Sequence, residues 1–262
     1  MTAATVPARR MSLWRLEWLR LVRTPRAVSL GAVYLAIGLI EPVATKYASA
    51  LLIHVAHGTA VSLPKPTAAQ ALSSYVGEAA IVGLIVLVAM AASAYNFDAR
   101  PGLSAFFRTR VPGMWRLVVP RFAASAAAGV VAYLLGTLAA WYETRLLIGP
   151  LPAGGLLAGM LCAAVYLVFA VAVTALAASL TTSTVASVGI TLAVLLAALP
   201  LLGDVHAISS WVPTALVGAP ADLATSPPAD DLAHFVPALG VSVVAGALAL
   251  TAAVRQLRAR ET

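Results

Sequence analysis

Few side chains in this sequence could carry out chemistry, and their spacing builds no familiar site. His54 and His57 are three residues apart, a spacing that lets two histidines share a metal ion on one face of a helix. No acid or cysteine lies close to them in the sequence, and Asp231 with His234 has the same shortcoming. We therefore expect no metal site at either pair.

Catalytic and nucleotide-binding motifs are missing as well. The chain has no His-Glu-x-x-His run, which would place two zinc-binding histidines beside a glutamate base. It has no Gly-x-Ser-x-Gly elbow, and no histidine stands among the serines of the apolar segments to activate them. Neither Lys46 nor Lys65 ends a glycine-rich phosphate-binding loop. We expect a chain that is not an enzyme and that binds no cofactor or metal itself.

The composition indicates a membrane protein. Of the 262 residues, 61% are hydrophobic and only 10% are charged, well below the usual quarter. The formal net charge is +7, but the arginines stand at the ends of apolar runs and form no basic stripe among aromatic residues, which argues against a nucleic-acid partner. The single cysteine, Cys162, excludes an intrachain disulfide and a thiolate metal cluster.

Six apolar segments have about the length that an α-helix needs to cross a bilayer, roughly 20 residues. They predict an all-α, polytopic membrane protein with a single transmembrane domain, residues 1–262. The predicted spans are 27–45, 75–95, 118–141, 154–179, 185–202 and 235–254. The fourth and fifth are separated only by the polar turn from Thr181 to Thr184, which favours a tight helical hairpin.

The charges between these spans indicate which way the chain faces. The segment from Asn96 to Arg121 holds Arg100, Arg108, Arg110, Arg116 and Arg121. An arginine at the centre of a spanning helix costs about 3 kcal/mol, so this segment should lie outside the hydrocarbon. With six spans it shares a side with both termini, and that side holds every lysine and arginine except Lys46, Lys65 and Arg145. The positive-inside rule therefore predicts that both termini and the loop 96–117 are cytoplasmic in a plasma-membrane protein.

Residues 12–24 precede the first span and are expected to form an amphipathic helix. Helical spacing divides its side chains into an apolar face, Trp14, Trp18, Leu21 and Val22, and a charged face, Glu17, Arg20 and Arg23. Tryptophans on one side and arginines on the other suit a helix that lies flat at the cytoplasmic lipid interface. The alternative is that these arginines only set the topology and that the segment has no fixed position.

Two outer features could shape an entrance to the bundle. The segment 203–234 holds apolar residues broken by prolines, around Trp211 and Pro213, and is predicted to be a re-entrant or capping element. Glu78 opens the second predicted span, so it could form an outer gate with Trp211 and Pro213. The alternatives are an ordinary outer loop with one interfacial tryptophan and a solvated interfacial carboxylate.

Apart from Arg121 near the start of span three, spans three to six contain no Asp, Glu, Lys, Arg or His, and this argues against a proton- or sodium-coupled carrier. They contain small residues instead, including Gly155 and Gly159 at GxxxG spacing, Ser125 with Gly129, and Ser242 with Gly246. Small residues let helices approach closely. We expect tight packing within the bundle or against a second membrane chain.

This layout resembles the membrane subunit of an ABC-2 type transporter. An interfacial helix, six spans, a charged loop after the second span and a broken outer segment before the sixth are similar to that family. The residues of the loop that carry the resemblance are Asp98, Arg100, Gly102, Phe106, Phe107, Thr109 and Arg121. The sequence departs from the family pattern at one point: Arg110 stands where the family has a proline, and the proline of this chain, Pro112, comes two residues later.

The resemblance implies that the loop is a coupling helix seated on a separate ATP-binding subunit, two copies of which would hold ATP and Mg. The implied coupling residues are Asp98, Arg100, Gly102, Leu103, Phe106, Phe107, Arg108 and Arg110. Leu103, Phe106 and Phe107 would enter a groove of the ATPase, while Arg108 and Arg110 would pair with its acids. The alternative is that these arginines only hold the loop inside and contact lipid phosphates.

The resemblance also implies a second membrane subunit, identical or different, and a path for cargo between the two. Few charges would line that path, which favours export of a hydrophobic or amphipathic compound such as a drug or a lipid-like molecule. Membrane lipids are the remaining expected partner. The alternatives are a non-transporting membrane scaffold and an intramembrane enzyme whose site has no recognised motif.

Overall fold

The computed structural model of the chain describes residues 13–55, 65–95, 113–225 and 228–259. These residues form helices joined by turns, and no β-strand occurs among them. Six of the helical segments are long and apolar enough to cross a membrane. The prediction of an all-helical chain with six such segments is thereby confirmed.

The helices follow one another along the chain, most of them with short turns between. The first described helix is the short α1 (Leu13–Arg23). The six long segments are, in order, α2 (Pro25–Val55), α3 with α4 (Ala68–Tyr95), α6 (Trp115–Leu147), α7 (Ala153–Leu180), α8 with α9 (Thr184–Gly203) and α11 (Pro228–Ala259). A further short helix, α10 (Ala215–Thr225), stands between α9 and α11.

Two of the long segments contain a π-helical turn. α3 (Ala68–Glu78) passes into α4 (Leu84–Tyr95) through the turn Ala79–Gly83. In the same way, α8 (Thr184–Leu192) passes into α9 (Leu199–Gly203) through the turn Ala193–Ala198. Such turns are rare and occur often at functional positions of helices.

The local sequence explains where several helices begin. Pro25 opens α2 directly after α1, because the first position of a helix needs no backbone N–H donor. The side chain of Thr67 caps α3 by accepting a hydrogen bond of 3.2 Å from the backbone N–H of Gln70. Between α7 and α8 the hydroxyl groups of Thr181 and Ser187 are 2.6 Å apart, so this polar turn holds the two helices together.

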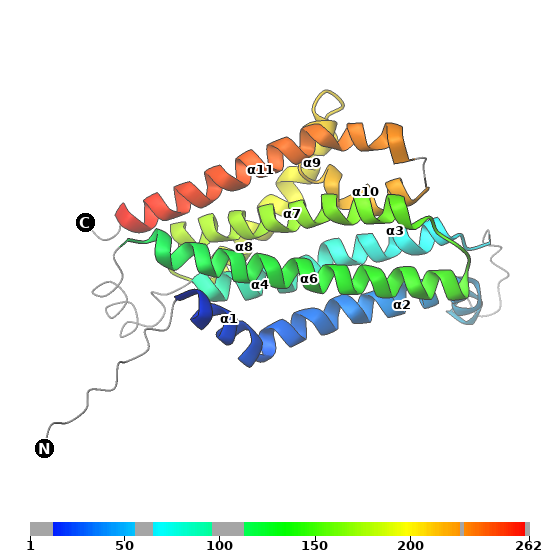
Figure 1. Ribbon diagram of the computed structural model, residues 1–262. Coiled ribbons are helices and arrows are strands. Elements are labelled where there is room, and N and C mark those ends of the chain that lie inside the picture. The colour runs from blue at the N-terminus through cyan, green and yellow to red at the C-terminus, as the bar shows by residue number, and fades with distance from the viewer. Residues whose placement is uncertain (1–12, 56–64, 96–112, 226–227, 260–262) are drawn as a thin grey trace, which may run out of the picture.

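The long helices lie alongside one another as one bundle (Figure 1). α7 runs through the bundle and packs against α4, α6, α8, α10 and α11. α2 packs on α6 at a crossing so close that a Cβ atom on Gly136 would lie 2.5 Å from the carbonyl oxygen of Tyr34. Only glycine at this position lets the two backbones meet.

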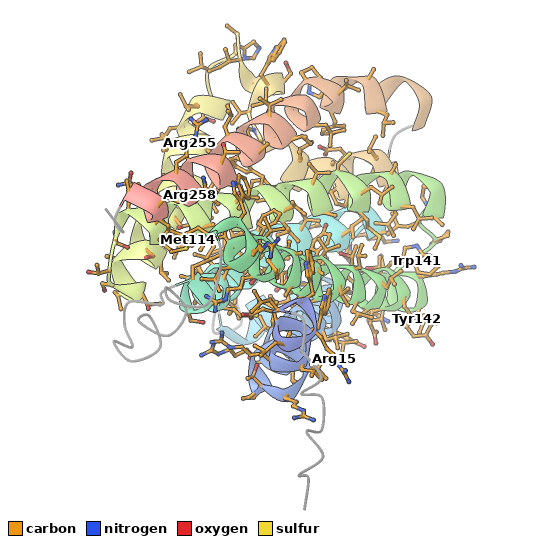
Figure 2. The ribbon with its side chains drawn as sticks, turned by 60° about the vertical axis from the view of Figure 1, so that its left-hand side comes forward. Arg15, Met114, Trp141, Tyr142, Arg255 and Arg258 are labelled. Carbon is orange, nitrogen blue, oxygen red and sulfur yellow. The ribbon has the colours of Figure 1, made fainter. Side chains whose placement is uncertain are left out.

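One end of the bundle carries α1, the start of α6 and the end of α11, and we call it the basic end (Figure 1). Arg255 and Arg258 of α11 lie near Met114 (Figure 2), and Arg15 belongs to α1 at the same end (Figure 1). Trp141 and Tyr142 of α6 lie toward the opposite end (Figure 2). Aromatic residues at both ends, with Trp14 and Trp115 at the basic end, are typical of a bundle that spans a bilayer.

The second long helix begins before its predicted span, and this changes the position of Glu78. Hydropathy placed the start at residue 75 because Ser73 and Ser74 are polar, whereas the capped helix already begins at Ala68. Glu78 is therefore the last residue of α3, about 15 Å along the helix from Ala68, and does not open the span. Its side chain is exposed in the isolated chain.

Candidate functional site

All of the predicted coupling residues, from Asp98 to Arg110, lie outside the described part of the chain. The structure describes the two helices that this segment joins, α4, which ends at Tyr95, and α6. Just before α6, Gly113 has a φ of 101°, a left-handed conformation that favours glycine. The carbonyl oxygen of Gly113 accepts a hydrogen bond of 3.2 Å from the N–H of Arg116, so the chain turns sharply into α6.

The short helix α1 turns its acidic side chain toward the bundle and its tryptophans away from it. Glu17 is 8% exposed, whereas Trp14 and Trp18 are 46% and 41% exposed. Arg20 is partly buried and Arg23 is exposed. The side chains thus separate into an inward side with Glu17 and an outward aromatic side, but contact with lipid stays a prediction.

A buried ion pair fixes α1 to the bundle. The guanidinium of Arg121 donates a hydrogen bond from Nε to Oε1 of Glu17 at 2.7 Å, and Arg121 is only 3% exposed. Its Nη1 also donates to the carbonyl oxygen of Ala94 at 3.3 Å. Because Arg121 is in the second turn of α6 and Ala94 is in the last turn of α4, one side chain joins three helices.

Sequence reasoning put Glu17 on the charged face of a helix and Arg121 at the end of the arginine-rich segment, and it missed that both side chains are buried and form a pair. Two signals were present. Glu17 is the only acid before the first span, and Arg121 follows Pro120 inside an apolar run, where an uncompensated charge would be costly.

Two hollows flank α1 at the basic end. One is a pocket of about 30 Å³ beside the ion pair, with Arg20, Thr24 and Arg26 among its lining residues. The other is an open groove of about 450 Å³ between α1 and the start of α6. The groove is lined by Leu13, Trp14, Trp115, Arg116, Val119 and Pro120. A basic and aromatic surface therefore stands next to the point where the chain enters α6.

A cluster of tyrosines occupies the interior of the bundle. The rings of Tyr34 on α2 and Tyr133 on α6 meet edge to face with centroids 5.9 Å apart, and the Tyr75 ring lies 6.4 Å from that of Tyr133. The Tyr75 hydroxyl is 3.2 Å from Oγ1 of Thr137. Within the described residues, the hydroxyl groups of Tyr34 and Tyr133 have no hydrogen-bond partner. These tyrosines form a polar layer among the apolar side chains of the core.

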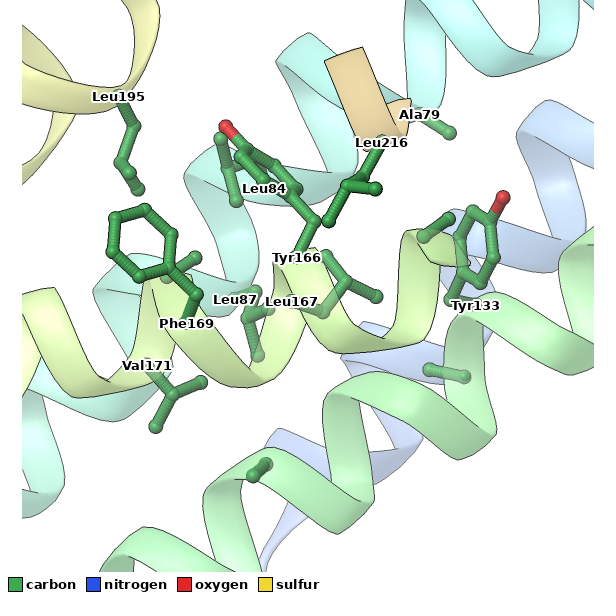
Figure 3. Close-up of a cluster of buried hydrophobic side chains, with 14 of the residues drawn as sticks. Ala79, Leu84, Leu87, Tyr133, Tyr166, Leu167, Phe169, Val171, Leu195 and Leu216 are labelled. Atoms are coloured by element: carbon green, nitrogen blue, oxygen red, sulfur yellow. The ribbon is translucent and has the colours of Figure 1, made fainter. Parts of the chain in front are cut away.

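A small cavity of about 20 Å³ adjoins this cluster. Tyr34, Tyr133 and Tyr166 line it, together with Ala79 of the π-helical turn and Val217 of α10. Figure 3 shows Tyr133, Tyr166 and Ala79 in their cluster of buried side chains. A cavity of this size holds one water molecule and no larger ligand.

Helix α10 covers the bundle at the end opposite to α1 and is buried against α3 and α7. Its Leu216, Ala219 and Leu223 have no exposed surface. A Cβ atom on Gly159 would lie 2.6 Å from the carbonyl oxygen of Ala219, and one on Gly155 would overlap the carbonyl group of Leu223. The GxxxG glycines of α7 therefore pack against α10 of the same chain.

The three residues of the predicted outer gate have different surroundings. Trp211 is 56% exposed, Pro213 is buried just before α10, and Glu78 is exposed on α3. Glu41 of α2 lies near enough to Glu78 for their charges to interact. A gate formed by these residues stays a prediction.

No group of three metal-binding side chains comes together among the residues that the structure describes. The side chains of His54, His57 and Asp231 are outside that part of the chain. The arrangement at the basic end, a buried ion pair beside a basic and aromatic groove, suits binding of a partner or a charged ligand better than catalysis. No protein-family model, no curated protein and no solved structure matches the chain.

Proposed function

We propose that this chain is the membrane subunit of an ATP-driven transporter of the ABC-2 type, which exports a hydrophobic or amphipathic compound. ATP and Mg would be bound by two copies of a separate ATP-binding subunit. A second membrane subunit, identical or different, would complete the path for cargo. In this proposal the basic end faces the cytoplasm and the chain lies in the plasma membrane.

The observation that supports this best is the connection made by Arg121. Segment 96–112 joins α4 to α6, and Arg121 of α6 contacts both Ala94 in the last turn of α4 and Glu17 of α1. A partner that pushed on this segment would therefore move three helices together. That is the mechanical requirement for a membrane subunit that receives its energy from another chain.

The rest of the bundle is compatible with such a role. The described parts of α7 and α8 contain no charged residue, so an ion relay has no support there. Helix α10 packs against α3, α7 and α11 toward the opposite end, where cargo would leave in this proposal. The π-helical turn Ala79–Gly83 lies beside α10 and gives α3 and α4 a point of local irregularity.

The test is co-purification from the native host. The tagged chain is extracted in mild detergent and its partners are identified by mass spectrometry. We expect an ATP-binding subunit with a phosphate-binding loop in the complex, and its loss when Phe106→Ala and Phe107→Ala are combined. The matched control is Tyr142→Ala, an exposed aromatic residue of α6 at the opposite end (Figure 2).

Two results would overturn the proposal. The first is a complex without any ATP-binding subunit, which would favour a membrane scaffold. The second is an ATP-binding subunit whose association is unchanged by the two alanines, which would remove the coupling role of Phe106 and Phe107. A metal ion bound in stoichiometric amount would favour the alternative that the chain is an intramembrane enzyme.

A further inference from the structure

The small pocket beside the ion pair, which we call the arginine pocket, has an unusual lining for a membrane-spanning bundle. Its walls come from α1, α2, α4 and α6. The polar side chains that line it are Glu17, Arg20, Thr24, Arg26, Arg121 and Ser125. Side chains that carry guanidinium or hydroxyl groups thus line about 30 Å³ of space from three separate helices.

The charges of the arginine pocket do not balance within the described residues that line it. Glu17 is the acid among them, and its carboxylate is held by Arg121 at 2.7 Å. Arg20 forms a longer ion pair with the same carboxylate, with Nη1 of Arg20 and Oε2 of Glu17 3.8 Å apart, so one acid faces three arginines. Arg20 and Arg26 therefore supply positive charge beyond what Glu17 offsets, and an anion would be stabilised there.

The donors favour an oxygen-rich anion. Arginine presents N–H groups in a planar fork that matches phosphate oxygens, and the hydroxyl group of Ser125 lines the same space. The hydroxyl group of Thr24 already donates to the carbonyl oxygen of Leu21. A space of 30 Å³ admits one or two oxygens of a phosphate group and leaves the rest of the ligand outside. The other lining residues, including Met90 and Ala124, are apolar. The part of the ligand next to the phosphate therefore meets apolar side chains.

The position of the pocket indicates where the phosphate comes from. It lies at the corner between α1 and α2, where the first apolar span begins and where Trp18 and Val22 of α1 are exposed. Tryptophan and basic residues at a helix boundary mark the headgroup level of a bilayer, and basic pockets between spanning helices bind anionic headgroups. We propose that the arginine pocket binds the phosphate of an anionic phospholipid, with Arg20 and Arg26 as its principal ligands.

This inference does not depend on the proposed transport function. A lipid held at the corner of α1 and α2 would set the angle of α1 against the ion pair of Glu17 and Arg121. Arg121 itself is a poor target for the test, because its loss would leave Glu17 buried without its partner. Arg20 and Arg26 are partly exposed and can be replaced with less harm to the fold.

The experiment is native mass spectrometry of the full-length, delipidated chain in detergent. Phosphatidylglycerol and phosphatidylcholine are added in parallel to the wild type, Arg20→Gln, Arg26→Gln and the double variant. We expect the wild type to retain phosphatidylglycerol preferentially and each substitution to weaken its binding roughly fivefold. The control is the double variant Arg255→Gln and Arg258→Gln, which removes the same charge from exposed positions of α11 at the same end.

Two further measurements separate the outcomes. Replacing Arg20 and Arg26 by lysine keeps the charge, and it should restore most of the preference for phosphatidylglycerol. Inorganic phosphate is added in the third arm, and in the wild type it should displace phosphatidylglycerol only weakly. Equal phosphatidylglycerol binding by the wild type and the double glutamine variant, with unchanged thermal unfolding, would overturn the proposal. If the wild type bound inorganic phosphate but not phosphatidylglycerol, the bound phosphate group would not come from a lipid.

Discussion

Arg121 and Glu17 are 104 positions apart in the chain, and their side chains meet at 2.7 Å in a buried ion pair. Both are almost removed from solvent, at 3% and 8% exposure. Removing one partner of such a pair leaves the other charge buried without compensation. We predict that Glu17→Ala lowers the free energy of unfolding by roughly 3–5 kcal/mol. Thermal and denaturant unfolding in detergent micelles would measure this loss.

A double-mutant cycle tests whether the loss belongs to the pair. Arg121→Met should be about as harmful as Glu17→Ala, and the double variant should be much less destabilised than the sum of the two. Arg23→Ala, an exposed arginine on the same helix, is the control and should change stability by less than about 0.5 kcal/mol. Strictly additive effects would show that Glu17 and Arg121 act independently.

Hydropathy was sufficient to predict the six long helices, because transfer of an apolar segment into lipid acts on each segment by itself. It could not predict where the helices end. α2 continues to Val55 although its predicted span ends at residue 45, since helical hydrogen bonds continue past the hydrocarbon. The start of the second helix was also placed late, since Thr67 caps a turn that hydropathy scores as polar.

The interior of the candidate site was harder to predict for a different reason. The approach of Glu17 to Arg121 depends on how α1 packs against α6, a contact between segments 104 residues apart that no local pattern records. The GxxxG signal at Gly155 and Gly159 indicated close packing but not its partner. That partner is α10, a short helix that contains Pro220 and whose composition allowed either an outer loop or a buried cap.

Adjacent glycines of α7 provide a matched pair for testing the contact with α10. A Cβ atom on Gly155 would collide with the backbone of Leu223, whereas no atom lies within 4 Å of the corresponding position on Gly154. We predict that Gly155→Ala destabilises the chain by about 1–3 kcal/mol, because backbone cannot move aside as a flexible side chain does. Gly154→Ala should be neutral or slightly stabilising, since alanine favours a helix more than glycine.

Thermal unfolding of the two variants gives the comparison directly. Protease protection of the segment that holds α10 gives a second measure, and Gly155→Ala should make it more susceptible. If Gly154→Ala and Gly155→Ala behave alike, α10 is not seated against this face of α7 in the membrane-embedded protein.

The tyrosine cluster predicts opposite results for two chemically identical changes. The Tyr75 hydroxyl lies 3.2 Å from Oγ1 of Thr137 and donates to the carbonyl oxygen of Tyr133 at 3.3 Å. Tyr75→Phe should therefore cost about 1 kcal/mol of stability. The Tyr34 hydroxyl is buried and has no partner among the described residues, so Tyr34→Phe should be neutral or stabilising.

Denaturant unfolding of the two variants in the same detergent would compare them. A loss of 1 kcal/mol or more for Tyr34→Phe would contradict the prediction. It would also show that the adjoining cavity of about 20 Å³ holds a water molecule hydrogen-bonded to Tyr34.

The direction in which the bundle faces can be measured by labelling single cysteines. Pro150 is exposed in the turn between α6 and α7, and Arg258 is exposed near the end of α11 at the basic end. The native Cys162 is 3% exposed, so it should give little background. Because positive charge is retained on the cytoplasmic side, Pro150→Cys should react with a membrane-impermeant maleimide on intact cells, and Arg258→Cys should react only after permeabilisation. The reverse pattern would place the basic end outside, where no cytoplasmic ATP-binding subunit could reach segment 96–112, and would remove the proposed transporter role together with the predicted topology.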